Sequence, residues 1–202
     1  MTGKKNVAVF LDRDGTIIED RGHLADPSDV VFFPETFEAL SSLQKQYRIF
    51  IVTNQSGVAK GCLDMEAVQR VNRHITTVLK EKGIEITGIY VCPHRREDGC
   101  ECIKPNSFFL EKAAADHGID LRRSFSVGDH PCDAQLAAKA GGEGIYILTG
   151  HGHKHIHELA SEVPVLPNIK SAADWILARR QVQDLNAKRR SGGAACQPCR
   201  PR

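Results

Sequence analysis

Acidic and hydroxyl side chains stand directly after short apolar segments at three separate places in this chain. Asp12 and Asp14 follow the apolar residues 7–11, Thr53 closes a second apolar run, and Asp129 follows a third. A phosphomonoester hardly reacts with a neutral nucleophile, so its barrier falls mainly through positioning and charge stabilisation. Carboxylates with a hydroxyl and backbone amides suit that task, and they indicate phosphoryl transfer.

The two acids of the first segment can take different parts in such a reaction. Asp12 is the candidate nucleophile, which would form an aspartyl phosphate. Asp14 is crowded by other carboxylates, so we expect a raised pKa and a role as general acid and base. Thr53 and the amides after it could hold the phosphoryl oxygens. Mg²⁺ prefers hard oxygen ligands, which Asp12, Asp129 and the main-chain carbonyl of Asp14 could supply.

Seven cysteines are an odd number for a disulfide framework, and three of them lie near one histidine within eleven residues. The types and spacing are those of a closed tetrahedral zinc site with the ligands Cys92, His94, Cys100 and Cys102. Four protein ligands leave no open position, so we predict a structural zinc that folds loop 92–102 and determines where Lys104 emerges. Free or buried thiols beside an incidental histidine are the alternative.

Short β-branched runs alternate with amphipathic stretches along the chain. The predicted strands are 7–11, 49–53, 86–91, 125–127 and 144–148. The predicted helices are 35–46, 64–82, 106–117, 132–140 and 171–185. This alternation indicates βαβ units, and therefore an α/β fold with a mostly parallel sheet covered on both faces. Polar residues at the carboxyl ends of its strands would meet in one crevice.

With 202 residues, 41% of them hydrophobic, the chain is long enough for one α/β domain and short for two. We predict a phosphatase domain over 1–185 and a disordered basic tail over 186–202, which has five Lys and Arg and no acid. The formal charge of +2 then leaves about −3 on the rest, which gives no reason to expect a nucleic-acid surface. The apolar runs are too short for a signal peptide or a membrane helix, so we expect a cytoplasmic protein.

The motifs together resemble the haloacid dehalogenase (HAD) superfamily of phosphatases. They are Phe-Leu-Asp-Arg-Asp-Gly-Thr, Val-Thr-Asn-Gln-Ser-Gly-Val-Ala-Lys-Gly, Cys-Pro-His with Cys-Glu-Cys-Ile-Lys-Pro, and Gly-Asp with Asp133. More narrowly, they are similar to the subfamily of D-glycero-D-manno-heptose 1,7-bisphosphate 7-phosphatases and histidinol-phosphate phosphatases. The resemblance covers about residues 6–180. It implies a Rossmann-like three-layer domain with a small zinc-binding loop and no large cap domain.

The resemblance also implies roles for individual residues. Asp12 would be the nucleophile, Asp14 the general acid and base, and Thr53 and Lys104 the phosphoryl stabilisers. Magnesium would be bound at Asp12, Asp14 and Asp129, and zinc by the same four cysteine and histidine ligands. The implied substrate contacts are Asp20, Arg21, Gly22, His23, Asn54, Gln55, Ser56, Ile103 and His130.

Two positions depart from the pattern of close relatives, which usually carry Arg before the lysine of the Lys-Pro pair and Lys after the metal-binding Asp. This chain has Ile103 and His130 there. Both changes remove a fixed positive charge from the place where a second phosphate or the sugar would be recognised. The expected substrate, the 7-phosphate of heptose 1,7-bisphosphate in carbohydrate metabolism, becomes less secure, whereas catalysis should survive.

Other functions remain open. Histidinol phosphate or another small sugar phosphate is the alternative substrate. A phospho-accepting signalling domain also uses strand-end acids with a Thr and a Lys, but Asp14 would hydrolyse the phosphoryl group that signalling must preserve. A zinc-stabilised binding module with an inactive site is the third possibility. We expect a small phosphorylated metabolite as the partner, and a monomer.

Three weaker signals carry little function. The alternating histidines 151, 153, 155 and 157 are interpreted as a polar loop and helix start, with a second metal site as the alternative. Cys196 and Cys199 lie in the predicted tail. Cys62 and Cys132 are interpreted as packing residues, although Cys132 lies close enough to Asp129 to make the site sensitive to oxidation.

Overall fold

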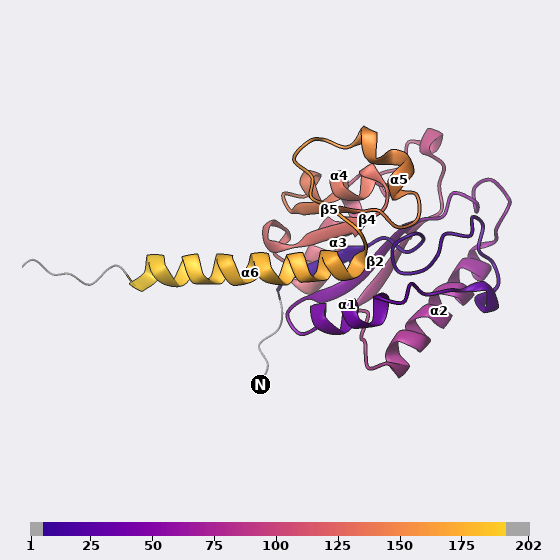
Figure 1. Cartoon of the computed structure of the whole chain (residues 1–202). Helices are drawn as coiled ribbons and strands as arrows, with labels where there is room; N and C mark the ends of the chain where they lie inside the picture. The colour runs from indigo at the N-terminus through magenta and orange to yellow at the C-terminus, as the bar shows by residue number, and fades with distance from the viewer. Residues whose placement is uncertain (1–5, 193–202) are drawn as a thin grey trace, which may run out of the picture.

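A six-stranded parallel sheet forms the centre of the protein (Figure 1). The computed structural model describes residues 6–192. The strands lie in the order β3-β2-β1-β4-β5-β6, and every neighbouring pair is parallel. Their bounds are β1 Ala8–Leu11, β2 Arg48–Asn54, β3 Gly88–Cys92, β4 Phe125–Gly128, β5 Glu143–Ile147 and β6 Val165–Leu166. The predicted parallel α/β sheet is confirmed; β6, with two residues, is too short to stand out in the sequence.

Helices connect the strands and cover both faces of the sheet. The α-helices are α1 Thr36–Leu43, α2 Met65–Glu81, α3 Phe108–His117, α4 Pro131–Lys139, α5 Gly152–His155 and α6 Ile169–Gly192. The short 3₁₀ helices are η1 Pro27–Asp29, η2 Arg96–Asp98, η3 Leu121–Arg123 and η4 Ile156–Glu158. Helix α2 begins where the sequence predicts, because the Asp64 carboxylate accepts a hydrogen bond from the amide of Ala67.

Side chains that alternate along the strands divide the core into two clusters, one on each face of the sheet. In β1, Val9 and Leu11 belong to the cluster that α1, α2 and α6 cover. Phe10 belongs to the cluster on the other face, which includes Leu110 of α3 and Leu136 of α4. The predicted three-layer arrangement is therefore confirmed. All four residues of β1 are buried, as expected for a central strand of a parallel sheet.

The prediction of a disordered tail was wrong for residues 186–192, because α6 continues to Gly192. Its sequence holds no proline, and Ala, Leu, Arg, Gln and Lys, which favour helices, predominate from residue 177 onwards. The rest of the predicted tail, with Cys196 and Cys199, lies outside the described residues. The domain limit at residue 185 stays a prediction. Within residues 6–192, no helix combines the length and the apolar character needed to cross a membrane.

The stacked aromatic rings of Phe10, Phe50 and Tyr90, beneath α3, allow a direct test of how the core is packed. Phe50 is fully buried, with its ring centroid 5.2 Å from that of Phe10 and 6.0 Å from that of Tyr90. We expect Phe50→Ala to lower the free energy of unfolding by about 3–5 kcal/mol, because it removes buried apolar area and leaves a cavity. Phe108→Ala is the control, since Phe108 is 41% exposed. Urea denaturation measures both, and equal losses would contradict this description of the core.

Candidate active site

The site lies where the order of the strands reverses. The chain runs from β1 outwards to β2 and β3, and then returns to place β4 on the other side of β1. Ligands bind at such a switch point, beyond the carboxyl ends of the strands. Asp12 follows β1 and Asp129 follows β4, so the pairing of the two strands brings these acids together. Thr53 lies near the end of β2, on the other side of β1.

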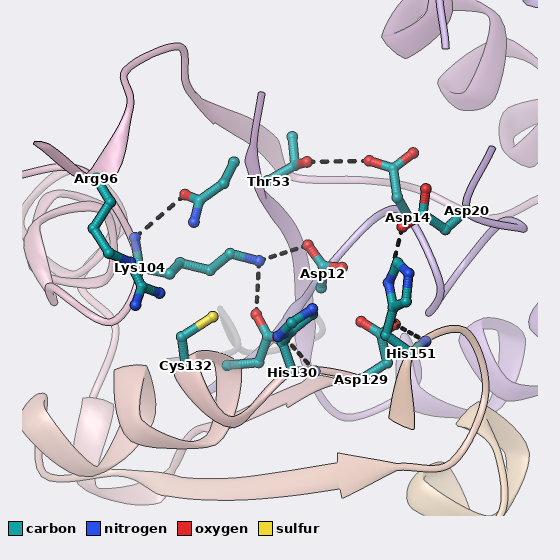
Figure 2. A pocket seen from close by; sticks show the side chains of 12 residues that line it. Asp12, Asp14, Asp20, Thr53, Arg96, Lys104, Asp129, His130, Cys132 and His151 are labelled. Carbon is teal, nitrogen blue, oxygen red and sulfur yellow. Dashed lines mark hydrogen bonds and ion pairs between the residues drawn. The ribbon is translucent and has the colours of Figure 1, made fainter. Parts of the chain in front are cut away.

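A pocket of about 260 Å³ opens at this point (Figure 2). It contains most of the groups that the sequence predicts to act on a phosphate. It is lined by Asp12, Asp14, Asp20, Thr53, Asn54, Arg96, Lys104, Asp129, His130, Cys132, Asp133 and His151.

A buried lysine bridges two carboxylates in the centre of the pocket. The Nζ atom of Lys104 donates hydrogen bonds to Asp12 Oδ1 at 2.5 Å and to Asp133 Oδ1 at 2.6 Å. The Lys104 side chain is 5% exposed. Burial alone would lower the pKa of Lys104, but the charges of Asp12 and Asp133 outweigh it and raise this pKa above its usual value. The ammonium group therefore stays protonated beside Asp12.

Asp133 is a site residue that the sequence interpretation recognised in the motif but gave no role. Its second oxygen accepts a hydrogen bond from the backbone amide of His130 at 3.0 Å, at the start of α4. It thus both caps the helix and pairs with Lys104. The signal in the sequence was its position four residues after Asp129, because the first turn of a helix that follows a strand end faces the same crevice.

Three carboxylates share this small space. One oxygen from each of Asp12, Asp129 and Asp133 lies within 4.8 Å of the others, close enough for one cation to bind. Burial, opposed by Lys104 and assisted by Asp133, raises the pKa of Asp12 to about 6. Burial and the charges of Asp12 and Asp133 raise the pKa of Asp129 to about 8. The acids are therefore difficult to ionise together without a cation.

Asp14 faces away from these three carboxylates. Arg13 donates two hydrogen bonds of 3.0 Å to its carboxylate, and Gln55 donates one of 2.8 Å. The Thr53 hydroxyl lies 3.4 Å from the same group. The pKa of Asp14 is raised, as predicted, but burial is the main cause rather than its acidic neighbours, and Arg13 opposes the rise. Arg13, fully buried and bonded to Asn72 of α2 at 2.8 Å, had no predicted role.

Asp129 is held by the backbone of two loops. The amide of His151 donates to Asp129 Oδ2 at 2.7 Å. Gly15 has φ 81°, and a side chain there would overlap the Asp129 carboxylate, so the site needs a glycine for both conformation and space. The histidine run forms the predicted helix start, α5, yet His151 also lines the pocket, with its Nδ1 3.2 Å from Asp20 Oδ2.

The nine predicted substrate contacts divide into two groups. Asp20, Asn54 and His130 line the pocket. The other six lie outside the pocket. Arg21 pairs with Glu19, Gly22 is exposed, His23 lies against Gly57, and Gln55 donates a hydrogen bond to Asp14. Ser56 and Ile103 do not line the pocket either. Arg96 lines the pocket without having been predicted, and Cys132, interpreted as a packing residue near Asp129, lines it as well. Burial raises the pKa of Cys132 to about 12, which favours the protonated thiol; the sensitivity of the site to oxidation stays a prediction.

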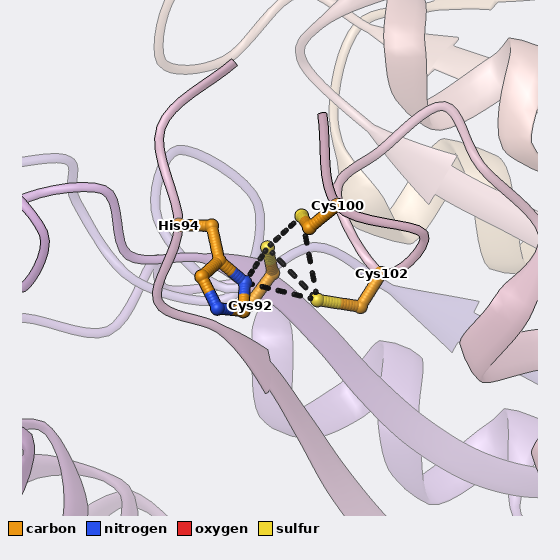
Figure 3. Close-up of side chains that lie close together, drawn as sticks. All are labelled: Cys92, His94, Cys100 and Cys102. Carbon is orange, nitrogen blue, oxygen red and sulfur yellow. Dashed lines mark hydrogen bonds between the residues drawn. The ribbon is translucent and has the colours of Figure 1, made fainter. Parts of the chain in front are cut away.

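The predicted metal-binding cysteines and histidine meet in a second cluster (Figure 3). The three sulfur atoms of Cys92, Cys100 and Cys102 are 3.3–3.6 Å apart. His94 Nδ1 lies 3.8 Å from Cys92 Sγ and 3.4 Å from Cys102 Sγ. These separations are far beyond a disulfide bond, and all four ligand atoms face one point.

Comparisons with known proteins agree with the resemblance seen in the motifs. A family model described as HAD-hydrolase-like matches residues 101–172. The chain is 34% identical to a D-glycero-beta-D-manno-heptose-1,7-bisphosphate 7-phosphatase of Helicobacter pylori, over 85% of this chain and 97% of that protein. It is 37% identical to the Vibrio cholerae enzyme of the same name, over 84% and 96%.

Two solved structures share the fold of this chain over most of its length. The D,D-heptose 1,7-bisphosphate phosphatase from B. bronchiseptica, complexed with magnesium and phosphate, superimposes with a TM-score of 0.78 at 29% identity. The match covers 86% of this chain and 98% of that one. A putative HAD-like phosphatase from Mesorhizobium loti gives a TM-score of 0.73 at 30% identity, over 85% and 84%.

The raised pKa values of Asp12 and Asp129 predict how stability depends on pH. Without a divalent cation the folded chain keeps these two protons up to about pH 6 and pH 8, whereas an unfolded Asp releases its proton near 3.8. Between about pH 4 and 8 the folded state binds more protons, so its free energy of unfolding falls as pH rises. Thermal melting in EDTA should show this fall, and added Mg²⁺ should raise Tm more at about pH 8 than at about pH 5.

Asp129→Asn serves as the control for that experiment, because it removes one of the two carboxylates whose raised pKa values cause the effect. Its melting temperature in EDTA should depend less on pH than that of the wild-type protein. A wild-type Tm that rises with pH in EDTA would contradict the prediction.

Proposed function

We propose that this chain, which belongs to the haloacid dehalogenase-like family of phosphatases, removes the 7-phosphate of D-glycero-D-manno-heptose 1,7-bisphosphate through an aspartyl phosphate on Asp12. The observation that carries the mechanism is the contact between Asp12 and the buried ammonium group of Lys104. The substrate is supported by the names of relatives that align along almost their whole length.

In the first step a carboxylate oxygen of Asp12 attacks phosphorus. A bond forms between phosphorus and that oxygen, and the bond from phosphorus to the sugar oxygen breaks. Asp14 gives its proton to the leaving oxygen, a role favoured by a raised pKa. Lys104 offsets the negative charge that collects on the nucleophile and the phosphoryl oxygens.

In the second step Asp14, now ionised, takes a proton from water as the water attacks phosphorus. The bond from phosphorus to Asp12 breaks, which restores the carboxylate and releases inorganic phosphate. Arg13 and Gln55 hold Asp14 in one orientation during both steps. The Thr53 hydroxyl lies beside Asp14, where it can donate a hydrogen bond to a phosphoryl oxygen.

Asp12 and Asp129 would hold Mg²⁺, with the main-chain carbonyl of Asp14 as a further oxygen ligand. The raised pKa values of both acids fit a site that binds a cation in its working state. The bound ion would supply positive charge next to the phosphoryl group. Asp133 offers a nearby oxygen, but Lys104 and the amide of His130 already use its two oxygens. We therefore place it as a support for Lys104.

Cys92, His94, Cys100 and Cys102 would hold zinc. Tetrahedral zinc with bonds of about 2.3 Å to sulfur separates its thiolates by about 3.8 Å. The separations of 3.3–3.6 Å approach that value. Burial raises the pKa of the Cys92 thiol, which a bound cation would reverse. Because Lys104 follows two residues after the last ligand, the same zinc would fix the lysine that pairs with Asp12.

The nucleophile is tested by Asp12→Asn. We expect phosphate release from para-nitrophenyl phosphate with Mg²⁺ to fall by roughly 10³-fold or more, because an amide cannot form the aspartyl phosphate. Phe108→Ala, at the exposed ring outside the pocket, is the matched control and should keep full activity. Activity that survives in Asp12→Asn would exclude the proposed mechanism.

The substrate is tested by a phosphate-release screen over sugar bisphosphates, sugar monophosphates and histidinol phosphate. Heptose 1,7-bisphosphate should give the highest kcat/KM, with the phosphate at position 7 released. A clear preference for histidinol phosphate would overturn the substrate and leave the aspartyl phosphate mechanism in place.

The zinc site is tested by Cys100→Ser. The wild-type protein should carry about one equivalent of zinc, and the variant should lose it together with thermal stability. Cys62→Ser is the control, because Cys62 is exposed and lies outside the cluster. Metal analysis by mass spectrometry and a thermal melt measure both effects. A variant that keeps wild-type zinc content would show that these residues do not bind it.

A further inference from the structure

We propose that Arg96 binds a second phosphate group on the substrate and thereby selects sugar bisphosphates over monophosphates. This inference rests on the proposed function, because it assumes that the transferred phosphoryl group sits at Asp12. It assigns a role in specificity to a residue for which the motifs gave none.

Two adjacent arginines of the zinc-binding loop, Arg95 and Arg96, make different contacts. Arg95 is used within the loop: its guanidinium lies 3.2 Å from Asp98 Oδ1, and its amide donates to Asp98 Oδ2 at 2.8 Å. This pair caps the 3₁₀ helix η2, in which Arg96 is the first residue. Arg96 instead lines the catalytic pocket. Since Arg95 and Asp98 satisfy each other, Asp98 is not available to neutralise Arg96.

The guanidinium of Arg96 has no partner among the side chains that the structure describes. No hydrogen bond or ion pair reaches it within residues 6–180, although it lines a pocket rich in carboxylates. The other permanently charged cation of the pocket, Lys104, is shared between Asp12 and Asp133. Among the pocket-lining Lys and Arg residues, Arg96 is therefore the one whose charge no side chain within residues 6–180 balances.

Positively and negatively charged side chains are distributed unevenly around the pocket. In Figure 2, Arg96 reaches past Lys104 towards Cys132, whereas Asp14, Asp20 and His151 lie across the pocket from it. A substrate with its reacting phosphate at Asp12 would meet like charge on the side of Asp20. Its second anionic group would be attracted to the side of Arg96.

This position also explains how the chain can tolerate the two departures noted in its motifs. Neither Ile103 nor His130 carries a fixed positive charge, and Ile103 does not line the pocket. Arg96 belongs to the same zinc-binding loop as the residues before Ile103, and it brings a fixed charge back to the pocket from another direction. A guanidinium is well matched to phosphate because it can donate two parallel hydrogen bonds.

The same charge would disfavour a substrate whose remaining part is neutral or cationic. A monophosphate gains nothing from Arg96, and an amino alcohol phosphate would bring its ammonium group towards a guanidinium. Arg96 thus favours a bisphosphate over either alternative at one and the same catalytic centre.

Binding to Asp12→Asn tests this inference without turnover. Isothermal titration calorimetry with Mg²⁺ would compare heptose 1,7-bisphosphate with heptose 7-phosphate, which lacks the second phosphate. Adding Arg96→Ala should weaken binding of the bisphosphate about tenfold and change binding of the monophosphate less than about twofold, the size expected for a hydrogen-bonded ion pair. Arg96→Lys should recover part of the loss, and Arg95→Ala is the matched control, which should preserve the ratio of the two affinities.

The outcomes separate this inference from the proposed function. Equal losses for both ligands would show that Arg96 only supports the loop, and an unchanged ratio would show that it binds no second phosphate; either result overturns the inference. If the wild-type protein releases phosphate from no ester, the proposed function fails, while the ratio of affinities still decides the role of Arg96.

Discussion

The buried ammonium group of Lys104 is the interaction on which the rest of the site depends. Removing a charge from water is costly unless partners replace the lost hydration. Asp12 and Asp133 do so at 2.5 and 2.6 Å; Asp12 follows β1, and Asp133 lies in the first turn of α4. The positive charge of Lys104 in turn reduces the repulsion between the two carboxylates, so that they can lie close together. Asp12, the start of α4 and the loop that carries the cysteine cluster are therefore held in one arrangement by a single charge.

Keeping these acids close together in a buried site costs free energy, which the stability of the surrounding fold offsets. Asp12 and Asp129 have raised pKa values because burial and repulsion from neighbouring carboxylates disfavour their ionised forms. Such strain is typical of functional sites and is sustained by the stability of the rest of the domain. Here the support is the parallel sheet, whose central strand β1 is buried along its whole length. The backbone at Gly15 and the amide of His151 then fix Asp129 where a cation can use it.

The loop between β3 and α3 joins structure to specificity. It contains little apolar surface, and its exposed residues include Arg95 and Arg96. Four closely placed ligand atoms give it a centre that a hydrophobic core would otherwise provide. The consequence is that one loop presents both Lys104, which contacts Asp12, and Arg96, which lines the same pocket. A change in this loop could alter the substrate without altering the chemistry.

The sequence alone determined the parallel sheet, the strand ends at Asp12 and Asp129, and the set of three cysteines and one histidine that cluster in the loop, because these depend on local periodicity and spacing. It also indicated the family. Only the tertiary structure decided which side chains meet. Burial, not neighbouring acids, dominates at Asp14; Arg13 holds that group; and Arg96 enters the pocket whereas Ile103 does not. Contacts between segments tens of residues apart depend on how the strands pair and how each loop turns, and a short motif carries no information about either.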